Sequence, residues 1–297
     1  MIDINNAKKI FEEYVGNYDL GDGKIALKYN HILRVAEISK NIAESLKLPE
    51  EEIKLAELIG IFHDIGRFEQ VKRFNTFVDR DSINHGEYGV KVLFEDGLIE
   101  KFNIEEKYYE TIRNAVLNHN RKSIEDGLSE HDLLHCKIIR DSDKLDIFYV
   151  LLTDKPINTY GIESMENETF SDEIVREFKE DHYIDYSKRQ TYGDKWISHM
   201  AFVYDFNFRS SYQIMKEKDY INKMYIRPNF KNSNTIRIAK EITEIADEYI
   251  CTNSIWRSLA FYIGFLFLYI QNNFKIYIKI IFTIFTNAFF YEIIQIN

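Results

Sequence analysis

Six histidine and aspartate residues lie at the edges of apolar, helix-like stretches in the first half of the chain. They are His31, the adjacent pair His63 and Asp64, His85, His119 and Asp143. Imidazole nitrogen and carboxylate oxygen are ligands that suit iron, manganese, zinc and similar divalent ions, whereas a soft thiolate site is excluded. Such an ion can acidify a bound water for hydrolysis. The residue types therefore indicate a metal centre whose ligands come from separate helices.

The pair His63 and Asp64 ends an apolar run that begins at Leu55. A carboxylate in a hydrophobic core is costly and normally needs a charged partner or a metal ion. The dipeptide alone is weak evidence, because a second copy, His131 and Asp132, occurs in a context that we interpret as the start of a surface helix.

Each candidate ligand also has a simpler interpretation when it is taken alone. A single histidine on a helix, such as His31, is more often a surface or hydrogen-bonded core residue than a ligand. Asp143 could belong to an exposed acidic turn with Asp141 and Asp146. The histidines outside the set are interpreted as structural or surface residues: His135, His182 and His199. The ordered set, with each member at the edge of an apolar stretch, is what favours a metal centre.

Helices are the elements expected to position these residues. Only 12 Gly and 3 Pro occur in 297 residues, so turns are few and long periodic stretches dominate. Apolar spacing predicts helices over residues 5–18, 25–48, 49–64, 85–93, 105–120, 129–152, 196–216 and 232–250. A charged loop is expected over 67–82, and a polar, aromatic segment over 153–195. The predicted fold is all-α, a helical bundle with additional C-terminal helices.

We expect three regions along the chain. Residues 1–152 form the metal-binding core, 153–251 a helical extension in the same globular unit, and 252–297 an apolar tail. Three interpretations of the tail are open: a membrane anchor or hairpin, a pair of packing helices, and an extension that is not native to the folded protein. Its apolar run 259–270 is shorter than the roughly 20 residues that span a bilayer. If counting starts at residue 255 and the polar residues 271–273 are tolerated, the segment 255–296 contains two marginal membrane spans. Contact of this segment with a membrane therefore stays open.

Charge and cysteine content narrow the class of protein. Lys and Arg total 38 against 48 Asp and Glu, and the net charge of −10 argues against general nucleic-acid binding. Two cysteines cannot build a disulfide framework, and the first 18 residues contain no secretory apolar segment. The catalytic part is therefore expected in the cytoplasm.

In this order the motifs resemble those of the HD-domain superfamily of metal-dependent phosphohydrolases. The resemblance rests on His31, on His63 and Asp64 within a Gly-Ile-Phe-His-Asp-Ile-Gly segment, and on Asp143 followed by Lys-Leu-Asp. It covers about residues 25–150, roughly half of the chain. It implies an all-helical fold in which these four residues hold a metal ion.

The remaining two histidines resemble a feature of particular branches of that superfamily. His85 and His119 are similar to the extra pair of the binuclear branches, in which the aspartate of the His-Asp pair, here Asp64, bridges both metals. Asn120 stands where many relatives carry a second consecutive histidine, which favours two metal ions over three. The implied cofactor is two divalent ions, with Mn, Fe, Zn, Mg, Co and Ni not distinguished by the ligand types.

The resemblance implies hydrolysis of a nucleotide, a cyclic mononucleotide or dinucleotide, or another small phosphate ester by a metal-activated water. The sequence lacks the Gly-Tyr-Pro signature of the cyclic-di-GMP branch, so that substrate is not implied. Asp64 would position the water. Arg67 and Lys144 would hold phosphate oxygens, because each lies within a turn of a proposed ligand. Two alternatives are a di-iron oxygenase of the same fold and a non-catalytic metal-binding or nucleotide-binding regulatory domain.

Overall fold

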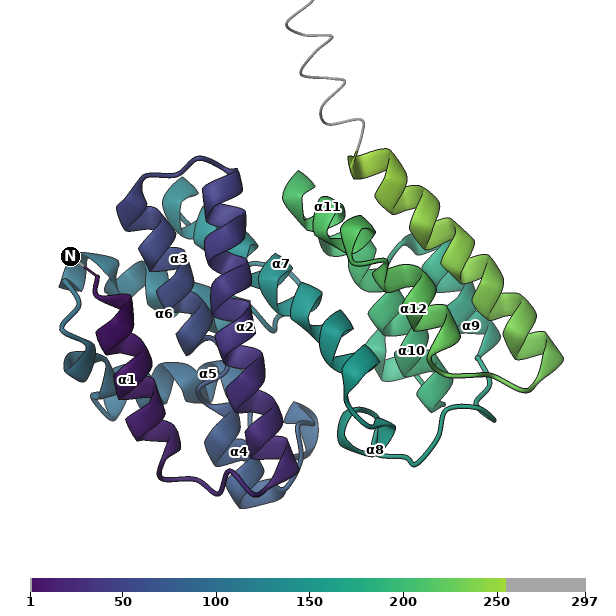
Figure 1. Ribbon diagram of the computed structural model, residues 1–297, viewed down its shortest axis with the longest axis horizontal. Helices are drawn as coiled ribbons and strands as arrows, with labels where there is room; N and C mark the ends of the chain where they lie inside the picture. The colour runs from purple at the N-terminus through teal and green to yellow at the C-terminus, as the bar shows by residue number, and fades with distance from the viewer. Residues whose placement is uncertain (1, 255–297) are drawn as a thin grey trace, which may run out of the picture. The chain divides into compact units, whose positions relative to one another are not determined.

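The computed structural model describes residues 2–254 of the chain. Within that range the chain forms helices and no strand, which confirms the predicted all-α class (Figure 1). Met1–Cys251 forms one compact unit. Among the described helices, none is both long and apolar enough to cross a membrane. The predicted membrane contact at 255–296 lies outside the described residues.

The first half of the chain contains the longest helices and several short 3₁₀ or π turns (Figure 1). The α-helices are α1 (Ile4–Val15), α2 (Gly23–Ser45), α3 (Glu50–Phe62), α4 (Arg67–Phe74), α5 (His85–Val90), α6 (Tyr109–Asn118) and α7 (Glu130–Thr153). The shorter turns are η1 (Asp79–Asp81), η2 (Lys91–Glu95), η3 (Leu98–Phe102) and η4 (Glu106–Tyr108).

The second half begins with a series of shorter helices, several of which pack against α7. They are α8 (Pro156–Thr159), α9 (Asp172–Arg176), η5 (Glu177–Asp181), η6 (Tyr186–Lys188), α10 (Tyr192–Met200), η7 (Ala201–Asp205), α11 (Arg209–Glu217) and α12 (Tyr220–Ile226). The chain is helical again from 233 to 254.

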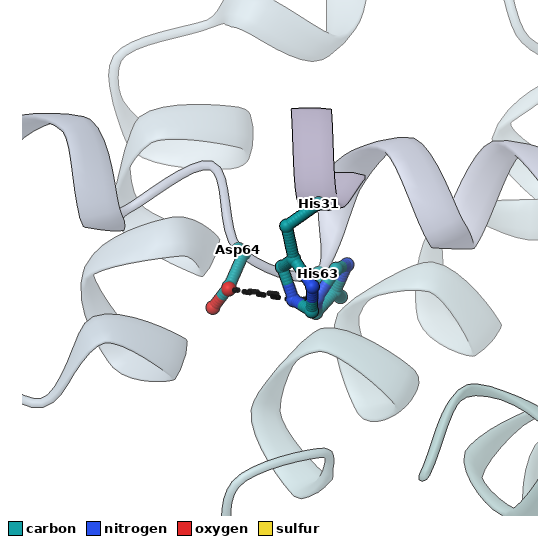
Figure 2. Close-up of side chains that lie close together, drawn as sticks. All are labelled: His31, His63 and Asp64. Atoms are coloured by element: carbon teal, nitrogen blue, oxygen red, sulfur yellow. Dashed lines mark hydrogen bonds and ion pairs between the residues drawn. The ribbon is translucent and has the colours of Figure 1, made fainter. Parts of the chain in front are cut away.

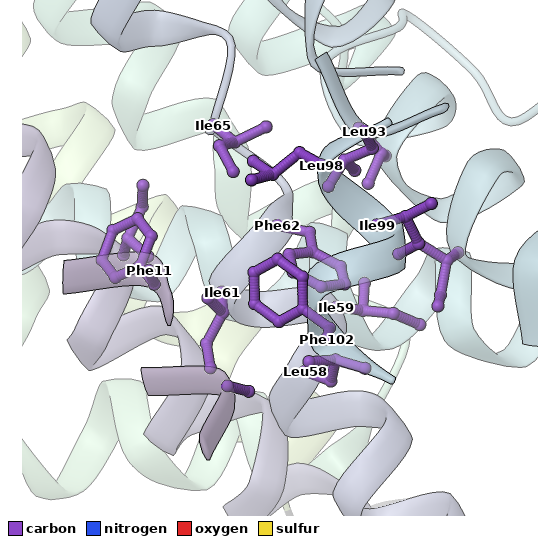
Figure 3. Packing of buried hydrophobic residues seen from close by; sticks show 14 of the residues in the cluster. Phe11, Leu58, Ile59, Ile61, Phe62, Ile65, Leu93, Leu98, Ile99 and Phe102 are labelled. Atoms are coloured by element: carbon purple, nitrogen blue, oxygen red, sulfur yellow. The ribbon is translucent and has the colours of Figure 1, made fainter. Parts of the chain in front are cut away.

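Two hydrophobic clusters stabilise these halves. The first surrounds α3, whose residues from Leu55 to Phe62 are all buried, and Figure 3 shows Phe62 packed against Phe102. The second surrounds Trp196 and contains side chains from α7 through the last described helix. Helix α7 contributes to both clusters, with Ile139 in the first and Phe148 in the second. It therefore joins the two halves.

Two predicted elements differ from the structure. The loop expected over 67–82 is wrong in its first part, because Arg67–Phe74 forms α4, which buries Phe68 and Val71. These are the only two apolar side chains that the helix buries, so the apolar signal is short. The helix expected over 196–216 is interrupted between α10 and α11, and α10 begins earlier, at a capping box formed by Thr191 and Asp194.

Candidate metal centre

The structure brings the six predicted ligands together from separate helices. His31 lies on α2 and Asp143 on α7. The others lie at helix ends: His63 at the C-cap of α3, Asp64 in the turn that follows, His85 at the start of α5 and His119 at the C-cap of α6. Five of them are buried, and the Asp143 side chain is 16% exposed, so a ligand bound at Asp143 could reach solvent.

Two glycines allow the helices that carry these ligands to approach closely. A Cβ atom at Gly60 would lie 2.5 Å from the Cα of Ala36, so α2 and α3 can touch backbone to backbone only without it. A Cβ atom at Gly66 would lie 2.3 Å from the carbonyl oxygen of His85. The first contact brings α3 against the helix of His31, and the second brings the turn after Asp64 against the start of α5.

The carboxylate of Asp64 faces a different histidine pair with each oxygen. Its Oδ2 atom lies 3.4 Å from Nε2 of His31 and 3.6 Å from Nε2 of His63 (Figure 2). Its Oδ1 atom lies 3.3 Å from Nε2 of His85 and 3.6 Å from Nε2 of His119. Asp64 thus belongs to both of the ligand groups that meet here and could hold a metal ion.

Asp143 joins the first of these two groups. Its Oδ1 atom lies 3.1 Å from Nε2 of His31 and 3.7 Å from Nε2 of His63. The interpretation of Asp143 as part of an exposed acidic turn is wrong, because Asp141 and Asp146 are buried.

The Nδ1 atom of each of the four histidines is hydrogen-bonded to an acceptor. Nδ1 of His63 donates to the Gly60 carbonyl at 2.8 Å, and Nδ1 of His119 donates to the Val116 carbonyl at 2.6 Å. A carbonyl cannot donate, so each Nδ1 carries the proton and the neutral ring presents a lone pair at Nε2. This is the arrangement that metal-binding histidines commonly have.

Two carboxylates hold the remaining rings. Nδ1 of His31 donates to Asp146 at 2.7 Å, and Nδ1 of His85 donates to Asp79 at 2.7 Å. The Nε2 atoms of His85 and His119 lie only 2.9 Å apart. With both Nδ1 atoms protonated, these neutral rings bring two lone pairs face to face, and a cation between them and Asp64 would satisfy both. The donor set therefore fits a divalent metal ion.

Charges inside the site keep the carboxylates ionised. Burial opposes ionisation of Asp64, yet the Lys28 ammonium and the neighbouring histidines hold the pKa of its carboxyl well below its usual range. Burial likewise opposes ionisation of Asp143, but the neighbouring His31 and His63 hold the pKa of its carboxyl well below its usual range. Burial and the Arg67 cation lower the pKa of His85 to about 3. The site therefore combines ionised carboxylates with a neutral His85.

His31 differs from His85 because three carboxylates surround it. Burial lowers its pKa, but hydrogen bonds to Asp143, Asp146 and Asp64 outweigh burial and raise the pKa to about 10. The same concentration of negative charge that attracts a proton to this ring attracts a metal cation.

Three side chains that contact the predicted ligands were not predicted from the sequence to be part of the site. Lys28 donates to Asp64 Oδ2 at 2.5 Å, and Asp146 and Asp79 orient His31 and His85. Lys28 precedes a proposed ligand by three residues and Asp146 follows one by three, so helical spacing was an available signal for both. Asp79 lies in η1, where no periodic pattern points to the site.

The two predicted phosphate-binding cations lie in different surroundings. Arg67 is at the centre, with Nε 3.4 Å from Asp64 Oδ1 and Nη1 donating to Asp79 at 3.0 Å. Lys144 pairs with Asp205 at 2.8 Å and lines a cavity of about 400 Å³ beside the centre. His119, Asp143 and several residues of the second half of the chain also line this cavity.

Comparisons with known proteins agree with the resemblance seen in the sequence. No curated protein and no solved structure was found to match the chain. The family model of the HD domain matches the region that carries all six candidate ligands. Residues 29–147 therefore form an HD domain, the domain of a superfamily of metal-dependent hydrolases.

Proposed function

We propose that this protein is a phosphohydrolase that uses two divalent metal ions to hydrolyse a nucleotide, a cyclic nucleotide or another small phosphate ester. The observation that carries the proposal is the position of Asp64, whose two oxygens each face one histidine pair. A carboxylate in that position can bridge two cations. Bound there, the ions would lower the pKa of a shared water and supply a hydroxide nucleophile at neutral pH.

The chain itself would hold this centre in a fixed geometry. Asp146 and Asp79 keep the proton of His31 and His85 on Nδ1, so that each Nε2 is available as a ligand. Arg67 contacts both Asp64 and Asp79 and is also bound to the Phe77 carbonyl at 2.7 Å. These internal contacts support a positioning role for Arg67 at Asp64, in addition to the predicted contact with a phosphate oxygen.

Lys144 is the better placed of the two cations for binding a phosphate group. It lines the cavity together with Arg140, and both cations pair with the half-exposed Asp205 at 2.8 Å. A phosphate group could replace the Asp205 carboxylate as their partner, because it presents more oxygens and more charge. The aromatic side chains of Phe202 and Tyr204 line the same cavity and offer apolar surface to the rest of a substrate.

We propose a small phosphorylated molecule as the partner of this site, and no general role in nucleic-acid binding. The net charge of −10 disfavours an extended polyanion, whereas a few cations beside a metal centre can hold one phosphate group. The proposed setting is the cytoplasm.

The test is a phosphate-release screen with the full chain loaded with manganese or iron. Phosphomonoesters, nucleotides and cyclic nucleotides are the substrates, and Asp64→Ala is the inactive variant. Asp126→Ala, a change at an exposed aspartate, is the matched control and should keep full activity. Absence of metal-dependent release, or full activity in Asp64→Ala, would refute the proposal. Oxygen uptake without phosphate release would support the oxygenase alternative, and binding without turnover the regulatory one.

A further inference from the structure

A second group of side chains that could bind a metal ion lies outside the candidate metal centre around Asp64, which is called the HD centre below. Glu52 is in the first turn of α3, and His131 and His135 lie in the first two turns of α7. The Oε2 atom of Glu52 is 2.8 Å from Nε2 of His131 and 2.8 Å from Nε2 of His135. The three ligand atoms are close enough to hold one ion. None of these residues takes part in the centre around Asp64.

Helical spacing places the two histidines side by side. His131 and His135 are four residues apart on α7, and their ring centroids are 5.0 Å apart. Both rings turn Nε2 toward the same carboxylate oxygen of Glu52, which comes from α3. Two imidazoles and one carboxylate form a ligand set that proteins use for zinc, with a further position left for water.

The hydrogen bonds around His131 determine where its proton lies. Thr111 Oγ1 donates its single proton to Asp132 Oδ1 at 2.5 Å, so it can only accept from Nδ1 of His131, at 3.2 Å. A neutral His131 therefore has its lone pair at Nε2, directed at the Glu52 carboxylate oxygen. Two acceptors at 2.8 Å need a positive centre between them, either a proton or a metal ion.

We propose that Glu52, His131 and His135 form a second metal site that binds one Zn²⁺ ion. The His131 side chain is 44% exposed and that of His135 is fully buried, so the ion would lie at the surface with water completing its coordination. The positive ends of the α3 and α7 dipoles oppose a cation there, and the acidic residues of the same two first turns offset them.

The ion would clamp α3 to α7 at their N-terminal ends. These two helices also present His63 and Asp143 to the HD centre. The role of the second site is therefore structural. It shares no residue with the HD centre. Its existence does not depend on the proposed phosphohydrolase activity.

The test counts zinc ions bound to the full chain by equilibrium dialysis and elemental analysis. His131→Gln and Glu52→Gln should each hold one ion fewer than the wild type, and the same loss should occur in an Asp64→Ala background, where the HD centre is disabled. His182→Gln, which removes a histidine stacked on Tyr204, is the matched control and should lose no ion.

Thermal unfolding gives a readout that is independent of activity. Zinc should raise the melting temperature of Asp64→Ala, because an ion that binds only the folded chain stabilises it. The increase should disappear in Asp64→Ala with His131→Gln. Equal zinc content in wild type, His131→Gln and Glu52→Gln would overturn the proposal and leave a hydrogen-bonded carboxylate with two histidines.

Discussion

Asp146 lies 2.7 Å from Nδ1 of His31, while Nε2 of the same ring faces Asp64 and Asp143. Asp146 also accepts from Nε and Nη2 of Arg34, at 2.7 and 2.9 Å. This two-point contact fixes the carboxylate, which in turn fixes the proton on His31. Asp146 therefore orients His31, a predicted metal ligand, without being one of the six predicted ligands itself.

Asp146→Asn should weaken metal binding while leaving all six predicted ligands in place. An amide can turn its NH₂ group toward His31, so the ring loses a fixed proton position. We expect a fall of about 10-fold to 100-fold in metal affinity, the range found when such partners are changed. Metal titration measures it, with Asp126→Asn as the control. Unchanged affinity would show that Asp146 only stabilises the fold.

Lys28→Met should have the opposite effect on metal affinity. The Lys28 ammonium lies 2.5 Å from Asp64 Oδ2, where it repels an incoming cation and occupies the oxygen that faces His31. Removing one positive charge at such a distance should tighten metal binding about 10-fold. Lys24→Met, which changes a partly exposed lysine bound to Asn75, is the control and should bind metal as the wild type does. Weaker binding in Lys28→Met would contradict this account.

Gly60→Ala should destabilise the protein and disturb the metal centre. The new Cβ would lie 2.5 Å from the Cα of Ala36, and backbone atoms at that contact can only separate. We expect a loss of about 1–3 kcal/mol in the free energy of unfolding, as for overpacked cores. Denaturant unfolding measures it. Gly23→Ala is the matched control, because its Cβ would meet its nearest neighbour at 3.9 Å. A Gly60→Ala protein with the same free energy of unfolding as the wild type would contradict the close backbone contact between Gly60 and Ala36.

The sequence predicted which six residues come together better than it predicted what holds them in place. Apolar spacing placed His31 and Asp143 on helices, and the composition indicated an all-α fold. The convergence of the ligands depends on close backbone contacts at Gly60 and Gly66, which join residues far apart in the chain. The orienting role of Asp79 comes from a short 3₁₀ turn without a periodic pattern. Such contacts have no local signal.

The prediction of one continuous helix over 196–216 was wrong because a contact between residues far apart in the chain interrupts it. Local spacing favours a continuous helix, but the chain leaves the helical path at Phe206 before α11 begins. The backbone N–H groups of Asn207 and Phe208 both donate to the carboxylate of Asp141, at 3.0 Å. Asp141 lies on α7, more than 60 residues earlier, so no local pattern predicts the break.

Asp141→Ala should therefore separate the second half of the chain from α7. The buried carboxylate accepts the two backbone N–H groups, the Asn207 side chain at 2.9 Å and the Ser211 hydroxyl at 2.6 Å. Loss of this acceptor leaves several donors unpaired, and we expect about 3 kcal/mol of destabilisation in denaturant unfolding. Asn207→Ala removes only the side-chain donor and should cost about 1 kcal/mol. Equal stability of the two variants would mean that the backbone contacts contribute nothing, and that packing around Trp196 alone holds this half in place.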